Sequence, residues 1–102
     1  MQPEGRLCSK IIREVVAKFP CSILEKVHGS PYGAVTLDLR GSVMGYAVEI
    51  EVKMPGKKPS KRQEKRIELL KEHNVITGWC DNEYDALRMI QDGLDARKCK
   101  CG

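Results

Sequence analysis

The sequence predicts a single α/β domain in which a helix is followed by three strands, a second helix, a fourth strand and a last helix. Three observations support this prediction. Apolar residues recur at helical spacing before Pro20, apolar and polar residues alternate strictly over 46–53, and a charged helical segment follows Ser60. A chain of 102 residues is long enough for one hydrophobic core and too short for much elaboration of it.

The first half of the chain is expected to hold one helix and three short strands. The helix spans residues 4–19 and ends at Pro20, because proline cannot continue a helix. Its apolar stripe is broad and comprises Leu7, Cys8, Ile11, Ile12, Val15, Val16 and Phe19. The strands that follow are expected over 21–27, 35–39 and 46–53.

The second half is expected to hold two helices with a strand between them. The predicted ranges are a helix from near Ser60 to about His73, a strand over 74–79, and a last helix from Asp81 or Asn82. Trp79 is expected to pack under the last helix. Residues 4–96 are expected to be structured, and 97–102 to form a flexible tail.

Charged residues on two of the strands suggest a functional site. Over 46–53 the alternation puts Glu51 and Lys53 on the polar face, roughly 7 Å apart at about 3.3 Å per residue. Asp38 lies on the polar face of the strand expected over 35–39. A tight turn at Met44-Gly45 would bring Asp38 opposite Glu51, whereas a turn at Gly41-Ser42 would hold them far apart.

Two carboxylates on adjacent strands are typical ligands of a hard cation. Together with a strand carbonyl, here that of Val52, and water, Asp38 and Glu51 would provide the all-oxygen shell that Mg²⁺ or Mn²⁺ prefers. The alternative is a solvated strand face on which Glu51 and Lys53 form an exposed ion pair of little energetic value.

The chain resembles the VRR-NUC family of the PD-(D/E)XK nuclease superfamily. The matching residues are Asp38, Glu51-Val52-Lys53, the run Pro55-Gly56-Lys57-Lys58-Pro59-Ser60, Gln63 and Thr77-Gly78-Trp79, and the resemblance extends from about Glu4 to about Ile90. It implies a PD-(D/E)XK-like αβββαβ core, with a mixed central sheet flanked by helices and an extra C-terminal helix. One departure concerns the family's usual Gly-x-Pro-Asp run, which is replaced here by Val35-Thr36-Leu37 before Asp38.

The resemblance also implies an activity and a role for each matched residue. The activity is that of a divalent-metal-dependent DNA endonuclease, in which Asp38 and Glu51 hold the metal, Lys53 positions or activates water, and Gln63 supports the site. Stand-alone members of the family are phage or bacterial proteins, and some act as homodimers on branched DNA such as four-way (Holliday) junctions. A non-catalytic nucleic-acid-binding module of the same fold is the alternative.

Two site residues have competing interpretations. Gln63 lies three residues after Ser60, which is the spacing of a capping box, but its spacing to Ile67 also turns it toward the sheet. Glu4 lies on the packed face of the first helix and is the candidate for an N-terminal site acid. Glu14 competes for this role, and Glu4 also fits an acid that stabilises the helix start.

The positive charge is concentrated in one segment. Eight Lys or Arg and two Glu lie between residues 53 and 71, a local charge of +6, so that the rest of the chain carries −2 of the overall +4. Such a segment beside carboxylates suits the phosphate backbone of DNA, although it also fits a solvated helix face. The DNA-binding candidates are Lys57, Lys58, Lys61, Arg62 and Lys65.

Further expectations concern location and assembly. The chain has no run of ~18 apolar residues, and its five cysteines lack C-x-x-C spacing, so that we expect a cytoplasmic protein with reduced thiols and no membrane contact. Cys99 and Cys101 are read as part of the tail. The width of the first helical stripe favours a homodimer, because Ile12, Val16 and Phe19 would otherwise expose apolar surface.

Overall fold

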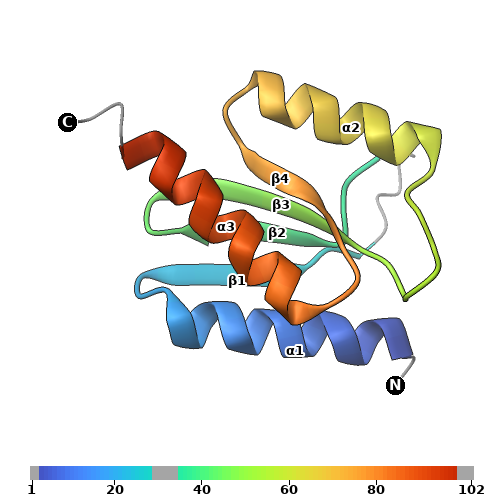
Figure 1. The fold of residues 1–102 in the computed structure, drawn as a ribbon, viewed down its shortest axis with the longest axis horizontal. Coiled ribbons are helices and arrows are strands. Elements are labelled where there is room, and N and C mark those ends of the chain that lie inside the picture. Colours follow the sequence, from blue (N-terminus) through green and yellow to red (C-terminus); the bar gives the residue numbers. More distant parts are fainter. Residues whose placement is uncertain (1–2, 29–34, 99–102) are drawn as a thin grey trace.

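Residues 3–28 and 35–98 are described by a computed structural model, in which they form three helices and one four-stranded sheet (Figure 1). The elements in chain order are α1 (Pro3–Lys18), β1 (Ser22–Lys26), β2 (Leu39–Val43), β3 (Tyr46–Val52), α2 (Lys61–Glu72), β4 (Ile76–Cys80) and α3 (Glu83–Lys98). This is the predicted order, and the predicted α/β class is confirmed.

The sheet is mixed and has the strand order β1-β2-β3-β4. β1, β2 and β3 pair antiparallel, whereas β4 runs parallel to β3. The β2–β3 turn lies at Met44 and Gly45, whose φ angles of 52° and 87° are those of a tight hairpin turn that matches the strand twist. The later of the two predicted turns is therefore correct. It pairs Leu39 with Ile50, and so places Asp38 beside the end of β3.

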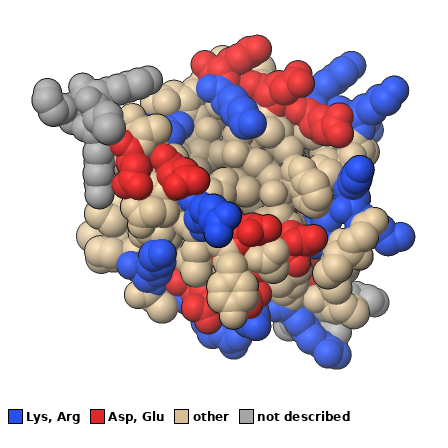
Figure 2. Space-filling view, viewed as in Figure 1, with Lys and Arg blue, Asp and Glu red and all other residues tan. Residues whose placement is uncertain are grey.

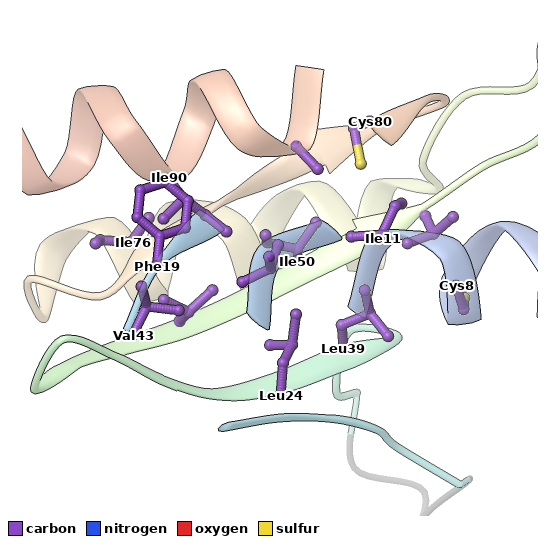
Figure 3. Close-up of a cluster of buried hydrophobic side chains, with 14 of the residues drawn as sticks. Cys8, Ile11, Phe19, Leu24, Leu39, Val43, Ile50, Ile76, Cys80 and Ile90 are labelled. Atoms are coloured by element: carbon purple, nitrogen blue, oxygen red, sulfur yellow. The ribbon is translucent and has the colours of Figure 1, made fainter. Parts of the chain in front are cut away.

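One face of the sheet packs against α1 and α3 and forms the main core (Figure 3). Ile50 lies at its centre, between Ile11 of α1 and Ile90 of α3, and all three are fully buried. Phe19 is only 5% exposed and belongs to this core. The expectation that Phe19 leaves apolar surface for a partner is wrong, because its ring is buried among the residues of the main core.

The opposite face of the sheet is covered by α2 at β3 and β4. Ile67 and Leu70 of α2 pack with Leu37 in a second, smaller core. As a result the polar face of β3 is not solvated: Glu49 is 3% exposed and Glu51 is 2% exposed. The alternative of a solvated strand face is therefore wrong for both carboxylates.

The second strand begins later than predicted. Leu37 lies in the core under α2 and Leu39 in the main core, so that the two side chains are on opposite sides of the sheet and not on one face. The chain bends at Asp38, whose carbonyl accepts a hydrogen bond from Val27 N at 2.7 Å. The predicted strand over 35–39 is thus replaced by a bend followed by β2, which frees the Asp38 side chain from the ladder.

Polar caps define the starts of the later helices. Asn82 Oδ1 accepts a hydrogen bond from Asp85 N at 2.8 Å and caps α3, as the sequence predicts. α3 continues to Lys98, two residues past the predicted end of the structured part at residue 96, and Arg97 donates to the Asn74 carbonyl. Cys99 and Cys101 lie outside the described residues. None of the described helices is long and apolar enough to cross a membrane.

Candidate metal centre

The predicted site residues meet at one end of the sheet, where β3 ends, the chain enters β2 and α2 begins (Figure 1). Asp38 Oδ2 accepts a hydrogen bond from Val52 N at 3.0 Å, which fixes this carboxylate beside the end of β3. Glu51 precedes Val52 and projects from the opposite face to the main core. The bend at Asp38 therefore brings the two carboxylates together from neighbouring strands.

Glu51 is held in an electrostatically costly state. Burial and the nearby charge of Asp38 raise the pKa of Glu51 from 4.5 to about 7, against the opposing effect of Lys53. The repulsion between two close carboxylates is the feature that a divalent cation would relieve.

Lys53 contacts the same carboxylate. Its Nζ lies 3.2 Å from Glu51 Oε2, and its side chain is 21% exposed, while that of Glu51 is 3% exposed. The predicted neighbours on one strand face are therefore in direct contact. The lysine connects a buried acid to the surface.

Gln63 fulfils both of its competing interpretations. Its Oε1 accepts from Ser60 N at 2.8 Å and its backbone N donates to Ser60 Oγ at 3.2 Å, which completes a capping box. Its Nε2 also donates to Glu51 Oε2 at 2.9 Å. One amide thus anchors the start of α2 and positions the site carboxylate.

A second buried carboxylate, Glu49, was not among the predicted site residues and joins the elements of the site. Glu49 accepts two hydrogen bonds from Arg66, from Nε and Nη2, each at 2.9 Å. Glu49 Oε2 also accepts from Leu37 N at 3.1 Å. Because Leu37 precedes Asp38, Glu49 holds both α2 and the segment that carries Asp38. The spacing in the sequence could have indicated this contact. Glu49 is two residues before Glu51 and so shares its strand face, and Arg66 is three residues after Gln63 and so shares its helix face.

Glu4 lies toward this end of the sheet, whereas Glu14 lies further along α1. Burial raises the pKa of the Cys8 thiol to about 11, and the charges of Asp38, Glu4 and Glu51 add to this effect. Cys8 in α1 thus lies near all three acids. Glu14 is exposed, and is about 15 Å further along the helix at 1.5 Å per residue.

The oxygen atoms at the site fit a hard cation with few protein ligands. Val52 N points to Asp38, and since the N–H and C=O of one strand residue point to the same side, the Val52 carbonyl also faces the site. No group of three or more His, Cys, Asp or Glu side chains is gathered for a metal within residues 3–28 and 35–98. Two carboxylates and one carbonyl suit Mg²⁺ or Mn²⁺, which keep several water ligands and use few carboxylates.

The predicted DNA-binding residues surround the start of α2. Lys57 and Lys58 are exposed in the loop after β3, and Lys61, Arg62 and Lys65 are exposed on α2. Figure 2 shows Lys and Arg side chains along the right-hand edge of the molecule, where α2 begins in Figure 1. The positive edge thus lies beside the carboxylates.

Trp79 does not pack under the last helix. In β4 a Cβ atom at Gly78 would lie 2.9 Å from Met89 of α3, so Gly78 faces α3 and Trp79 faces the opposite side. Trp79 pairs with Glu51 in the sheet register and is 39% exposed. This expectation was wrong because the alternation of β4 places the smallest residue, and not the largest, under α3.

Comparison with solved structures identifies the fold. The chain is similar to a structure described as a VRR_NUC domain, with a TM-score of 0.71 and 19% sequence identity, over 89% of this chain and 97% of that one. No family model and no curated protein matches the sequence. The expected fold is therefore confirmed: the chain has the fold of a VRR-NUC domain, a mixed sheet flanked by helices with α3 at the C-terminal end.

Replacing Arg66 by Leu is expected to lower the free energy of unfolding by about 2–4 kcal/mol, because Glu49 would stay buried without its cation. Urea denaturation measures this loss. Lys65→Leu is the matched control: it removes an exposed cation from the same helix, and should change the stability by less than about 0.5 kcal/mol. Equal effects of the two substitutions would show that the Glu49–Arg66 pair does not hold α2 in place.

The stability of the metal-free protein is expected to fall as the pH rises from about 4.5 to about 7. In this window the folded state keeps a proton on Glu51 that the unfolded chain has released. Above it the loss is on the order of 2–3 kcal/mol. Glu51→Gln should remove this dependence, whereas the exposed Glu64→Gln should retain it; urea denaturation at pH 5 and pH 8 tests both. The same slope in Glu51→Gln would place the raised pKa elsewhere.

Proposed function

We propose that this protein is a divalent-metal-dependent nuclease that hydrolyses phosphodiester bonds of DNA. The observation that carries the proposal is the environment of Glu51: a buried carboxylate beside Asp38, in contact with Lys53 and Gln63, next to a positively charged edge. The likeness in fold to a VRR_NUC domain structure supports it.

Asp38, Glu51 and the Val52 carbonyl would hold a Mg²⁺ or Mn²⁺ ion. When bound, such an ion lowers the pKa of a water ligand and stabilises negative charge on a phosphate. Lys53, whose Nζ lies 3.2 Å from Glu51 Oε2, would orient a nucleophilic water and stabilise the charge that develops on the phosphate. Gln63 keeps Glu51 in position through its Nε2. Glu4, one helical turn before Cys8 in α1, would be the N-terminal acid of the site; burial raises the pKa of Cys8, and the charge of Glu4, like those of Asp38 and Glu51, adds to this effect.

The exposed cations beside the site would hold the substrate. Lys57, Lys58, Lys61, Arg62 and Lys65 lie in one loop and the helix that follows it, so they can follow a phosphate backbone on either side of the scissile bond. This arrangement favours a polyanion such as DNA over a small phosphate ester.

We further propose that the substrate is branched DNA, such as a four-way junction, cut by a homodimer. Two sites related by a two-fold axis would match the two strands of a junction. The surface of α1 provides less support than the sequence suggested, since Phe19 is buried and Ile12 packs against the core; Val16, at 48% exposed, remains.

Lys53→Met is expected to retain the fold and cation binding but to lose DNA cleavage, because the ammonium group is not a metal ligand. Cleavage of flap, nicked, single-stranded and four-way junction DNA with Mg²⁺ or Mn²⁺ measures the loss. Removing one group that stabilises the transition state typically costs on the order of 10²–10³ in rate. The control is Lys71→Met, an exposed lysine at the far end of α2, which should cut at the wild-type rate. Cleavage by Lys53→Met at that rate would exclude the proposed role.

Cation binding separates the enzyme from a non-catalytic DNA-binding module. Asp38→Asn and Glu51→Gln should each abolish both cleavage and the increase in melting temperature that Mn²⁺ produces at pH 8. DNA binding that persists in both variants, together with a wild-type protein that neither binds Mn²⁺ nor cuts DNA, would instead identify the module.

Replacing Lys57, Lys58, Lys61 and Arg62 by Gln is expected to weaken DNA binding and to reduce its salt dependence. The slope of log K against log salt should change by about one for each phosphate contact that is lost. Titrations of labelled DNA at several salt concentrations measure it. The matched control is Lys10→Gln and Arg13→Gln on α1, and an unchanged slope in the fourfold variant would show that the positive edge faces away from DNA.

A homodimer is expected to sediment at micromolar concentration as a particle of about 23 kDa, twice the 11.5 kDa of one chain. Val16→Glu should shift the protein to the monomer if α1 forms the interface. A monomer that cuts both strands of a junction symmetrically would contradict the dimer.

A further inference from the structure

The side chain of Trp79 is an exposed aromatic group next to the candidate metal centre. Trp79 is the neighbour of Glu51 across the β3–β4 ladder, and paired residues of parallel strands share a face of the sheet. Adjacent strands are about 4.8 Å apart, so the indole is adjacent to the carboxylate that would hold the cation. Asp38 lies on the β2 side of Glu51, and Trp79 on the β4 side.

Packing of the core does not account for this position. Both hydrophobic cores are made by other residues: Ile76 and Cys80 of β4 contribute to the main core, and Ile67, Leu70 and Leu37 form the second. Trp79, the single tryptophan of the chain, belongs to neither core, and 39% of it is exposed. A large aromatic surface left open beside a site has the chemistry of a stacking partner.

The charge around Trp79 is also suited to DNA. Lys53 follows Glu51 on the same strand face, and the first turn of α2 carries Lys61 and Arg62. By contrast, Tyr84, the other exposed aromatic residue within 3–28 and 35–98, lies in the acidic first turn of α3, between Glu83 and Asp85. The cations near the candidate metal centre would attract a phosphate backbone toward Trp79 when a metal ion compensates Asp38 and Glu51, whereas the acids around Tyr84 would repel it.

We propose that Trp79 stacks on an unpaired nucleobase directly next to the scissile phosphate. This inference rests on the proposed nuclease function and adds a substrate class: DNA that presents a base free to leave the helical stack, at a flap, a single-stranded end or the branch point of a junction. Every base has a π face, so the contact selects an unstacked base and not a sequence. Trp79 is therefore a specificity-determining residue.

The intrinsic fluorescence of Trp79 gives a test that needs no substitution. Because it is the single tryptophan, all tryptophan emission reports this position. Single-stranded oligonucleotides, titrated into the full chain in EDTA so that no cleavage occurs, should quench the emission, and blunt duplex DNA of the same length should do so much less. Equal quenching by both, or none by either while labelled DNA binds, would overturn the inference.

An abasic scan identifies the partner base. In the wild-type protein, one abasic position next to the cleavage point should weaken binding about 5- to 150-fold, the range for one stacked base. Trp79→Leu should weaken binding of the intact strand by a similar factor, and should be insensitive to the same abasic position. If each abasic position has the same effect in Trp79→Leu as in the wild type, Trp79 does not contact a base.

Two further variants control for folding. Trp79→Phe keeps an aromatic face and should retain most of the affinity and the sensitivity to the abasic position. Tyr84→Leu, the matched control, should change neither. If Trp79→Leu does not fold, Trp79→Phe and the fluorescence titration still decide the question.

Cleavage by the wild type separates this inference from the proposed function. Coupling between Trp79 and one base in a protein that cuts no DNA with Mg²⁺ or Mn²⁺ would leave the stacking contact valid and refute the nuclease. Cleavage without coupling at any position would refute the stacking contact and leave the nuclease valid.

Discussion

The structure depends on how two buried carboxylates on one strand face are neutralised. Glu49 and Glu51 both lie beneath α2, where a charged group without partners would cost several kcal/mol. Two residues on one face of α2 contact these carboxylates: Arg66 forms an ion pair with Glu49, and Gln63 donates a hydrogen bond to Glu51. The position of α2 on the sheet, and with it the place of the positive edge, follows from these contacts.

The two carboxylates are not neutralised equally. This difference indicates that Glu49 has a structural role and Glu51 a functional one. Glu49 has a bidentate guanidinium and a backbone N–H, so its charge is fully matched. Glu51 has an amide, a partly exposed lysine and the repulsive neighbour Asp38, which leaves its pKa near 7. The contacts of Glu49 therefore stabilise the fold, whereas the negative charge of Glu51 is only partly compensated. Perturbed carboxylates of this kind are typical of functional sites.

The elements around the end of β3 determine which groups lie near Glu51. The bend at Asp38 contributes the second carboxylate, the loop after β3 and the start of α2 contribute cations, and β4 contributes Trp79. Three segments that are separate in sequence, namely the bend at Asp38, the loop after β3 with the start of α2, and β4, thus meet at one edge of the sheet.

The order of elements, the hairpin at Met44-Gly45, the cap at Ser60 and the grouping of Asp38, Glu51, Lys53 and Gln63 could all be predicted from the sequence, because periodicity, turn residues and capping are local properties. Three further features depend on tertiary contacts. The bend that separates Leu37 from Leu39 exists because the two leucines are buried in different cores, and the burial of Glu49 depends on Arg66 arriving from another element. The outward face of Trp79 is set by Gly78 packing against Met89. The bend and the orientation of Trp79 have no local signal in the sequence. Glu49 shares a strand face with Glu51, and Arg66 shares a helix face with Gln63, but only the fold shows that these two faces meet.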